Sequence, residues 1–321
     1  MFRKLPIILT ADDLLDKAFK KTKKVQIIDR NALYKKKKTI IARTDSFSTI
    51  IIDNLEKYVK EFPSINNLPL FYQEIIDIKI DTDKLKKSLG AVDWARKTCQ
   101  MIYSKQSKSL KKSKNLDFLV KKQQEIQGRI SSVLKQIDKE LQNLAIAQNI
   151  MKDFPDLEDM PTVVIAGYPN VGKSSLLKCI SKARPKIAQY PFTTKEIHVG
   201  HIERKEKYIL KRFQVIDTPG LLDRPLSKRN EIEKQAIAAI THLADIIVFM
   251  IDVSETCGYS LENQKHLLTQ MKKMFKNSKI IVVENKGDIK KSKSKNIKIS
   301  CESGEGINDL IDALFSQYEF E

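Results

Sequence analysis

The first half of the chain carries its apolar residues at helical spacing. In the stretches 47–62, 85–102 and 130–144, apolar positions recur every three or four residues, as on one face of an amphipathic helix. The segment Thr10-Ala11-Asp12-Asp13 has the composition of a capping box at a helix start. Because such faces are stable only when they cover one another, the pattern predicts an α-helical bundle over residues 1–158.

The pattern changes after the polar stretch 154–161, which contains two prolines and is typical of a domain linker. Short β-branched runs then predict strands at Val163–Ala166, Ile197–Glu203, Ile209–Asp217, Asp245–Asp252, Lys279–Glu284 and Asn296–Ser300. Between and after them, helices are expected at Lys173–Ser181, Asn230–Leu243, Ser260–Phe275 and Ile307–Gln317. This alternation predicts an α/β domain over residues 159–321, with a mainly parallel six-stranded sheet covered by helices on both faces.

Charge adds the expectation of an anionic partner. The 321 residues, long enough for two domains, carry 58 Lys and Arg against 40 Asp and Glu, a net charge of +18. Residues 17–43 hold eleven basic side chains and one acidic, and residues 96–122 hold nine and one. We expect nucleic acid on these clusters, and a plain solvated surface is the alternative. The candidate RNA contacts are Lys35, Lys36, Lys37, Lys38, Lys111 and Lys112.

The spacing of the cysteines and the length of the apolar runs indicate the cellular compartment of the protein. The four cysteines lie far apart, without the spacing of a zinc site, and fit a reducing interior. Residues 1–24 contain three aspartates and no long apolar core, so no secretion signal is expected. The longest apolar runs, such as Ile246–Ile251, are too short to span a bilayer, so no membrane partner is expected.

Residues 167–174 match the phosphate-binding pattern G-x-x-x-x-G-K-[ST], between an apolar strand and a helix. The glycines allow close approach of phosphate, and exposed N–H groups at the helix start hold the anion. Lys173 would place a cation beside the β- and γ-phosphates, and the Ser174 hydroxyl would bind Mg²⁺. The expected nucleotide-binding residues here are Gly167, Tyr168, Pro169, Asn170, Val171, Gly172, Lys173, Ser174 and Ser175.

Two companion motifs predict a triphosphate switch. Asp217-Thr218-Pro219-Gly220 ends an apolar strand, so Asp217 would hold Mg²⁺ through water and the Gly220 N–H would face the γ-phosphate. Pro191-Phe192-Thr193-Thr194 lies between this motif and the phosphate loop, and Thr194 would close on Mg²⁺ and the γ-phosphate. We therefore expect Lys173, Thr194 and Gly220 to be the catalytic residues.

Two further motifs predict that the base is guanine. In Asn285-Lys286-Gly287-Asp288, the Asp288 carboxylate would accept two hydrogens from the guanine N1/N2 edge, which adenine cannot supply. Lys286 would lie along the base, and Asn285 would either bond N7 or join neighbouring loops. In Ser300-Cys301-Glu302, a main-chain N–H near Cys301 would meet guanine O6. The expected ligands are therefore GTP and Mg²⁺.

The ordered motifs resemble those of GTP-binding proteins related to translation factors. Residues 190–195, 217–233 and 254–260 narrow the resemblance to the nucleolar GTP-binding protein 1 family, an Obg-like group, and the opening residues 5–14 resemble its helical domain. The resemblance implies a GTPase of large ribosomal subunit assembly that binds ribosomal RNA and precursor particles. It also implies a monomer off the ribosome, located in the cytoplasm if archaeal and in the nucleolus of the nucleus if eukaryotic. Since the chain ends at Glu321, we expect the short, archaeal-type form.

Hydrolysis is expected to be slow. Many related GTPases place a water-orienting glutamine directly after the glycine of Asp217–Gly220, where this chain has Leu221 and Leu222. No histidine is obviously placed to act instead, so a partner would raise the rate. Asn170 resembles the asparagine that binds potassium in some related GTPases, with bonding inside the loop as the alternative. Three arginines are expected on the surface or facing RNA rather than acting as arginine fingers: Arg184, Arg224 and Arg229.

Two alternative functions stay open at this point. One is a non-catalytic scaffold that holds nucleotide on precursor ribosomes, which the leucines after Gly220 favour. The other is a GTPase acting on mature ribosomes. The turn-like segment Ser254–Ser260 has no chemical explanation from the sequence.

Overall fold

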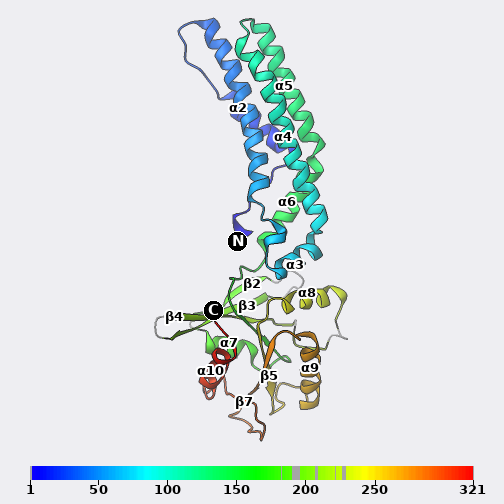
Figure 1. The fold of residues 1–321 in the computed structure, drawn as a ribbon, viewed down its shortest axis with the longest axis vertical. Helices are drawn as coiled ribbons and strands as arrows, with labels where there is room; N and C mark the ends of the chain where they lie inside the picture. Colours follow the sequence, from blue (N-terminus) through cyan, green and yellow to red (C-terminus); the bar gives the residue numbers. More distant parts are fainter. Residues whose placement is uncertain are drawn as a thin grey trace. The chain divides into compact units, whose positions relative to one another are not determined.

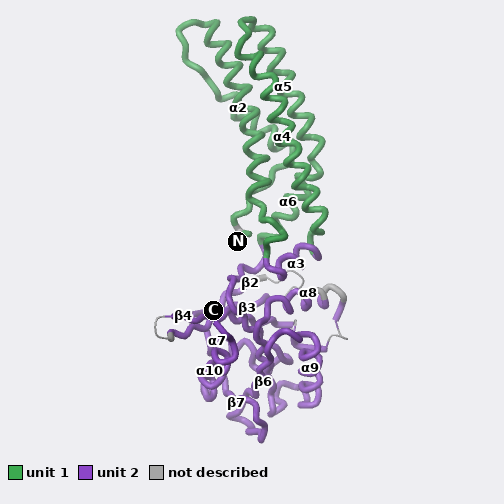
Figure 2. The backbone as a smooth tube through the Cα atoms, in the orientation of Figure 1, with its two compact units in different colours: residues 1–68, 79–152 green, residues 69–78, 153–321 purple. Residues whose placement is uncertain are grey.

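The computed structural model describes residues 2–181, 183–189, 196–206, 209–220, 222–225 and 229–320. The chain forms two compact units, which Figure 2 shows in separate colours. The first, called here the helical unit, comprises Met1–Leu68 and Lys79–Lys152. The second, called the sheet unit, comprises Pro69–Ile78 and Asp153–Glu321. The helix α3 (Leu70–Ile80) therefore falls largely in the sheet unit, a placement that helical periodicity alone did not indicate.

The helical unit is the predicted bundle (Figure 1). Its elements are η1 (Phe2–Lys4), α1 (Ala11–Lys23), α2 (Ala32–Glu61), η2 (Ile65–Asn67), α4 (Thr82–Lys112), α5 (Leu116–Gln136) and α6 (Asp138–Lys152). The predicted cap at Thr10 is present, because its hydroxyl oxygen accepts a hydrogen bond from the Asp13 N–H at 3.2 Å. The apolar stripes are buried between the helices, with Phe47, Val92 and Ile130 all fully inaccessible. The helical part of the predicted fold is thus confirmed.

In the described residues the sheet unit has seven strands, not six. They are β1 (Thr162–Ala166), β2 (Lys186–Gln189), β3 (Glu196–Glu206), β4 (Ile209–Asp217), β5 (Ile246–Asp252), β6 (Lys279–Asn285) and β7 (Ile297–Lys298). Their order is β2-β3-β4-β1-β5-β6-β7. The pairs from β4 through β7 are parallel, whereas β3 runs antiparallel to both β4 and β2. The prediction missed β2 because this edge strand is only four residues long and is held by pairing with β3.

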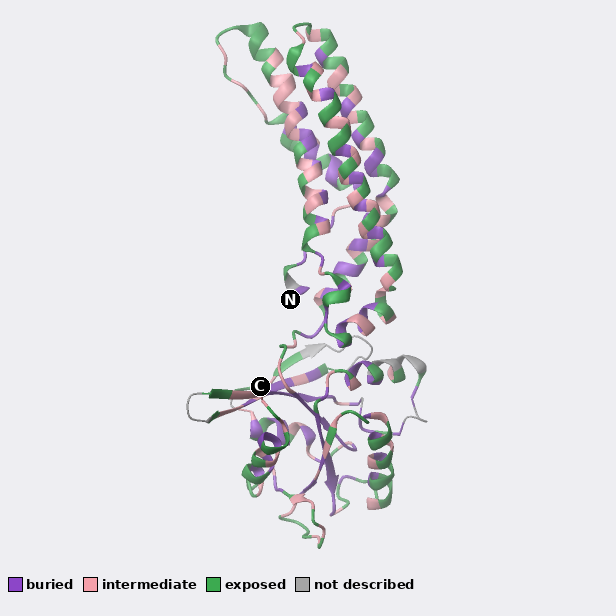
Figure 3. Ribbon diagram, in the orientation of Figure 1, coloured by how far each residue is buried: buried purple, intermediate pink, exposed green. Residues whose placement is uncertain are grey.

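Helices cover both faces of this sheet, as predicted. Figure 1 shows α7 (Lys173–Ile180) and α10 (Ile307–Gln317) on one face, and α8 (Glu231–Thr241) and α9 (Leu261–Met274) on the other. The central strands β1 and β5 are buried along their whole length, which Figure 3 shows as purple ribbon. Because β1, β4, β5 and β6 are parallel, the loops at their carboxyl ends meet at one edge of the sheet. In the described residues no helix has the length and apolar character needed to cross a bilayer.

Candidate functional site

The loop after β1 is shaped by two glycines with left-handed backbone angles. Gly167 has φ 141° and Gly172 has φ 103°. A Cβ atom on Gly167 would lie 2.6 Å from the Met250 carbonyl oxygen, and one on Gly172 would collide with the Asn285 amide. Helix α7 begins directly after Gly172, so its first N–H groups face the loop. The predicted phosphate loop is therefore present and leaves no room for larger residues at either glycine.

The Lys173 side chain folds back onto this loop. Its side chain is buried, and Nζ donates hydrogen bonds to the carbonyl oxygens of Gly167 at 2.8 Å and Tyr168 at 2.7 Å. The Gly167 N–H in turn donates to the Leu222 carbonyl oxygen at 3.1 Å. The loop, its lysine and the chain after Asp217–Gly220 are thus hydrogen-bonded together at the expected phosphate position.

Ser174 and Asp217 lie together at the start of α7 and the end of β4. The Ser174 hydroxyl donates to Asp217 Oδ2 at 2.5 Å. The other carboxylate oxygen, Oδ1, is buried and has no hydrogen-bond partner in the described part of the chain, and the same is true of Thr218 Oγ1. A buried carboxylate oxygen without a donor fits a site for a metal ion or its bound water. These residues therefore suit the predicted Mg²⁺.

His198 was missed by the sequence analysis, which placed no histidine near the site. It pairs with Asp217 across the antiparallel strands β3 and β4, and its Nδ1 lies 3.7 Å from Asp217 Oδ2. Whether this histidine orients the attacking water is not tested by this contact, so the expected slow hydrolysis stays a prediction. The only signal in the sequence was the position of His198 at the start of the predicted strand 197–203, and the strand register decides which residue it faces.

Asn285 joins the phosphate loop to the loop that was expected to read guanine O6. Its Nδ2 donates to the Val171 carbonyl oxygen at 2.8 Å, and its Oδ1 accepts the Cys301 N–H at 3.1 Å. Of the two roles considered for Asn285, the structure shows the joining one. Asp288 and Glu302 are exposed beside these loops, and Ser300 is buried beneath them.

Lys286 is held by two acceptors that the sequence analysis did not identify. Its Nζ donates to Asp252 Oδ2 and to Thr256 Oγ1, each at 2.7 Å. Asp252 is fully buried, which by itself raises its pKa, but hydrogen bonds from Lys286, Ser254, Thr256 and the Cys257 N–H outweigh the burial and lower the pKa to about 2. Asp252 is therefore a carboxylate at neutral pH and fixes the lysine ammonium.

This network explains the segment Ser254–Ser260. The Ser254 N–H donates to Asp252 Oδ1 at 2.9 Å, and the Cys257 N–H donates to Oδ2 at 2.8 Å. The Tyr259 ring lies against the Tyr168 ring of the phosphate loop, with centroids 4.3 Å apart. The segment is thus a structural support for both Lys286 and the phosphate loop.

Arg229 is not a surface residue, contrary to expectation. Its guanidinium is buried, and it donates to the Gly220 carbonyl oxygen at 3.0 Å and to the Arg224 carbonyl oxygen at 3.2 Å. Burial is the main cause that lowers its pKa, against the favourable charge of Asp223. Arg229 therefore anchors the chain after Asp217–Gly220. The other two arginines are exposed, and Arg224 pairs with Glu233 at 2.7 Å.

Comparison with known proteins identifies the family. Residues 2–158 match the model of the NOG1 N-terminal helical domain, and residues 231–288 match the model of Nucleolar GTP-binding protein 1 (NOG1). The chain belongs to the NOG1 family. Its sheet unit is a P-loop GTPase domain, as predicted.

Relatives match the NOG1-family chain over most of its length. The uncharacterized protein MJ1408 of Methanocaldococcus jannaschii is 41% identical over 292 residues, which is 90% of this chain and 81% of that protein. Nucleolar GTP-binding protein 1 of Kluyveromyces lactis is 33% identical over 90% of this chain, but only 45% of its own length is covered. The chain thus spans less than half of this nucleolar relative. A crystal structure of putative nucleolar GTP-binding protein 1 from Plasmodium falciparum is 30% identical over 51% of this chain and 95% of that chain, with a TM-score of 0.41.

Some of the predicted site residues of this NOG1-family chain are not tested by the structure. Phe192, Thr193, Thr194 and Leu221 lie outside the described residues, so their roles stay predictions. Asn170 is exposed with φ 60°, and in the described residues its side chain makes no hydrogen bond. Bonding inside the loop therefore does not account for this asparagine.

The predicted RNA contacts lie at one end of the helical unit. A cavity of about 230 Å³ is lined by residues from both basic clusters: Leu33, Tyr34, Lys37, Lys114 and Leu116. Lys37 and Lys114, more than seventy residues apart in sequence, thus line one cavity where α2 begins and α4 ends (Figure 1). Of the six candidates, Lys37 is partly covered and Lys38 pairs with Asp29 at 2.7 Å, while the other four are exposed.

Proposed function

We propose that this chain hydrolyses GTP to GDP and phosphate with Mg²⁺ and acts as a switch in assembly of the large ribosomal subunit. The observation that carries the proposal is the double hydrogen bond of Asn285 to Val171 and Cys301. It makes the loop that holds phosphate and the loops that read the base one connected site. A guanine nucleotide bound there would contact both ends of that connection.

Each residue of the phosphate site has its own role in binding and hydrolysis of GTP. The N–H groups of the phosphate loop bind the β-phosphate, and Lys173 gives its ammonium to the β- and γ-phosphates in place of the Gly167 and Tyr168 carbonyls. Ser174 and Asp217 hold Mg²⁺, whose charge offsets that of the phosphates. Arg229 holds the Gly220 carbonyl oxygen and so anchors the chain directly after the Gly220 N–H, which faces the γ-phosphate in this proposal.

Turnover is slow without a partner in this proposal. Leu221 offers no group that orients water, and Leu222 is fully buried with its carbonyl oxygen bonded to the Gly167 N–H. A partner that supplies a cation would raise the rate on the order of 10³–10⁵-fold. The same observation favours the second candidate, a scaffold on precursor ribosomes that holds nucleotide without hydrolysing it.

Single-turnover hydrolysis separates these two candidates. GTP is loaded in the presence of Mg²⁺, and the release of phosphate is followed for the wild type and for Lys173→Ala. A switch hydrolyses bound GTP measurably faster than the variant, because Lys173 stabilises charge on the transferred phosphoryl group. Equal rates at equal occupancy would exclude catalysis and leave the scaffold.

RNA docking is proposed for the basic end of the helical unit. Four exposed lysines form what we call the bundle-end cluster: Lys35, Lys36, Lys111 and Lys112. Within the described residues none of these four forms an ion pair, and Tyr34, which is 54% exposed, offers a ring for base stacking beside them. Lysines without acidic partners next to an exposed ring suit an RNA strand better than a plain solvated face.

Replacing the bundle-end cluster with glutamine tests this assignment. Affinity for labelled large-subunit ribosomal RNA should fall, and the slope of log affinity against log salt should flatten by about 0.7–0.9 for each phosphate that the variant no longer neutralises. The control variant replaces four exposed lysines of the sheet unit, at or just beyond α9: Lys265, Lys272, Lys273 and Lys276. Equal slopes for both variants would refute the docking site. Co-sedimentation with precursor large subunits, and not with polysomes, would separate the assembly role from action on mature ribosomes.

A further inference from the structure

The chain that follows β6 and ends with β7 carries a second concentration of positive charge. Residues 289–298, called here the lysine loop, contain five lysines and no acidic residue. All five lysines are exposed: Lys290, Lys291, Lys293, Lys295 and Lys298. We propose that the lysine loop is an RNA-backbone contact beside the guanine-reading residues. This inference rests on the RNA binding proposed above and adds a surface in the other unit.

A buried carboxylate holds the lysine loop in place. Glu284, at the end of β6, is 5% exposed, and it accepts hydrogen bonds from the Ser292 hydroxyl and from Asn296 Nδ2, the latter at 2.9 Å. The Ser292 hydroxyl oxygen also accepts the Ser294 N–H at 3.2 Å, and the Ser294 hydroxyl oxygen accepts the Asn296 N–H at 3.2 Å. Short polar residues at 292, 294 and 296 therefore face inward and anchor the loop.

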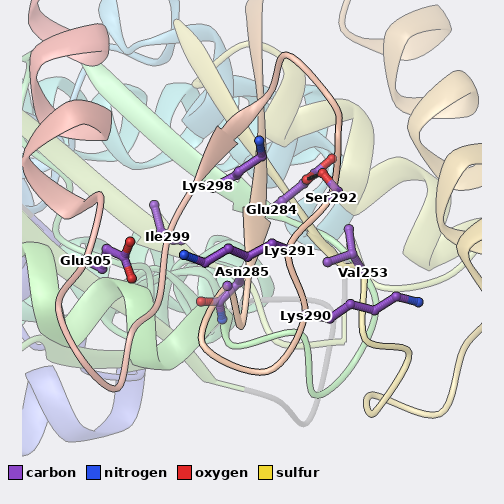
Figure 4. A pocket seen from close by; sticks show the side chains of 10 residues that line it. Val253, Glu284, Asn285, Lys290, Lys291, Ser292, Lys298, Ile299 and Glu305 are labelled. Carbon is purple, nitrogen blue, oxygen red and sulfur yellow. Dashed lines mark hydrogen bonds between the residues drawn. The ribbon is translucent and has the colours of Figure 1, made fainter.

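The lysines alternate in sequence with these anchors. Figure 4 shows Glu284 and Ser292 meeting, while the side chains of Lys290 and Lys291 extend elsewhere around a cavity of about 120 Å³. Burial raises the pKa of Glu284, but the hydrogen bonds of the anchors and the charge of Lys298 outweigh it and keep the carboxylate charged. The negative charge of Glu284 therefore faces the polar residues that anchor the loop.

Most of the loop's positive charge has no partner in the described part of the chain. Lys290, Lys291, Lys293 and Lys295 form no ion pair there. Like charges packed in one loop repel one another, so an ordered loop of this kind is favoured when a polyanion lies against it. The five lysines are spread over ten consecutive residues, and the side chains of Lys290 and Lys291 extend in different directions (Figure 4). They therefore suit successive phosphates of a strand better than one free phosphate.

The residues that flank the lysine loop on both sides are hydrogen-bonded to one another beside the nucleotide site. Glu284 directly precedes Asn285, and the Ile299 N–H donates to the Glu284 carbonyl oxygen at 2.8 Å. The Ile299 carbonyl oxygen accepts the Gly287 N–H at 3.0 Å. RNA on the loop would therefore lie within a few residues of Lys286 and Asp288, which read the base in the proposed function.

The test removes the positive charge of four lysines and keeps the polar residues at 292, 294 and 296 that anchor the loop. The loop variant replaces Lys290, Lys291, Lys293 and Lys295 with glutamine. The control is the α9 variant defined above, which removes the same charge from the same unit. Binding of a fluorescently labelled RNA hairpin to the full chain is titrated over a range of KCl concentrations. The salt slope of the loop variant should fall by about 0.7–0.9 for each phosphate left without its lysine, whereas the control keeps the wild-type slope. Unchanged GDP affinity by calorimetry verifies that each variant is folded.

The outcomes separate this inference from the function it rests on. If the wild type binds no RNA, the proposed docking function fails and the inference fails with it. If the bundle-end variant weakens RNA binding and the loop variant matches its control, only the lysine loop is overturned. A loop variant that keeps RNA binding but loses binding to polyglutamate would also overturn the inference, and would assign the loop to an acidic protein.

Discussion

Asp252→Asn tests whether one buried carboxylate organises the base-binding side of the site. The substitution keeps the shape of the side chain and removes its charge. In the native structure, Oδ2 accepts hydrogen bonds from Lys286 Nζ, Thr256 Oγ1 and the Cys257 N–H. Oδ1 accepts from the Ser254 N–H. The asparagine side chain has one oxygen, which accepts, and one NH₂ group, which donates. In either orientation the NH₂ group faces N–H or O–H donors that the carboxylate accepted, so at least one buried contact becomes repulsive.

The size of the effect follows from the pKa of Asp252. A shift from 3.8 to about 2 corresponds to roughly 2.4 kcal/mol of stability at neutral pH, since one pKa unit is about 1.36 kcal/mol. Because the pKa is lower in the folded protein, this stability is complete above about pH 4. It is lost as the pH falls from about 4 toward 2, where the folded carboxylate takes up its proton.

Hydrogen exchange in increasing urea measures this effect in the sheet unit alone. The peptides to follow cover residues 246–264, and their exchange reports the free energy of unfolding of that unit. At pH 7 the variant should lose about 2–3 kcal/mol, and the difference from wild type should shrink as the pH falls from about 4 to 2. Asp159→Asn, at an exposed aspartate, is the control and should change stability by less than about 0.5 kcal/mol. A loss for Asp252→Asn no larger than that of the control, or a difference that does not vary with pH, would refute the role assigned to Asp252.

Three further predictions concern the nucleotide. Asp288→Asn should weaken GTP binding on the order of 10²–10⁴-fold and favour XTP, because two hydrogen bonds to a charged acceptor disappear; retained GTP preference in a competition assay would mean that the base pocket is misplaced. GTP hydrolysis should be faster in KCl than in NaCl if Asn170 binds potassium, and equal rates would end that role. Gly172→Ala should cost about 1–3 kcal/mol of GDP affinity by calorimetry, through its positive φ and the collision with Asn285; wild-type affinity would show that the loop adapts.

Much of the phosphate site was predictable from contiguous residues. The spacing from Gly167 to Ser174 contains both glycines, the lysine and the metal-binding hydroxyl, because main-chain N–H groups of one short loop and one helix start form the anion site. Asp217 was predictable in the same way, since it ends an apolar run that is recognisable as a strand. Local chemistry of this kind does not depend on which distant segment lies alongside.

The contacts that hold the site together were decided by the tertiary structure. His198 faces Asp217 only because β3 and β4 pair antiparallel in one register, and a shift by one residue would turn it to the other face. Asn285 meets Val171 across 114 residues of sequence, and Lys286 meets Asp252 across 34. Such pairs depend on strand order, which alternating apolar runs do not encode. Arg229 has the sequence neighbourhood of a surface residue, and only the folded chain shows that its guanidinium fills a buried position and binds the Gly220 carbonyl oxygen.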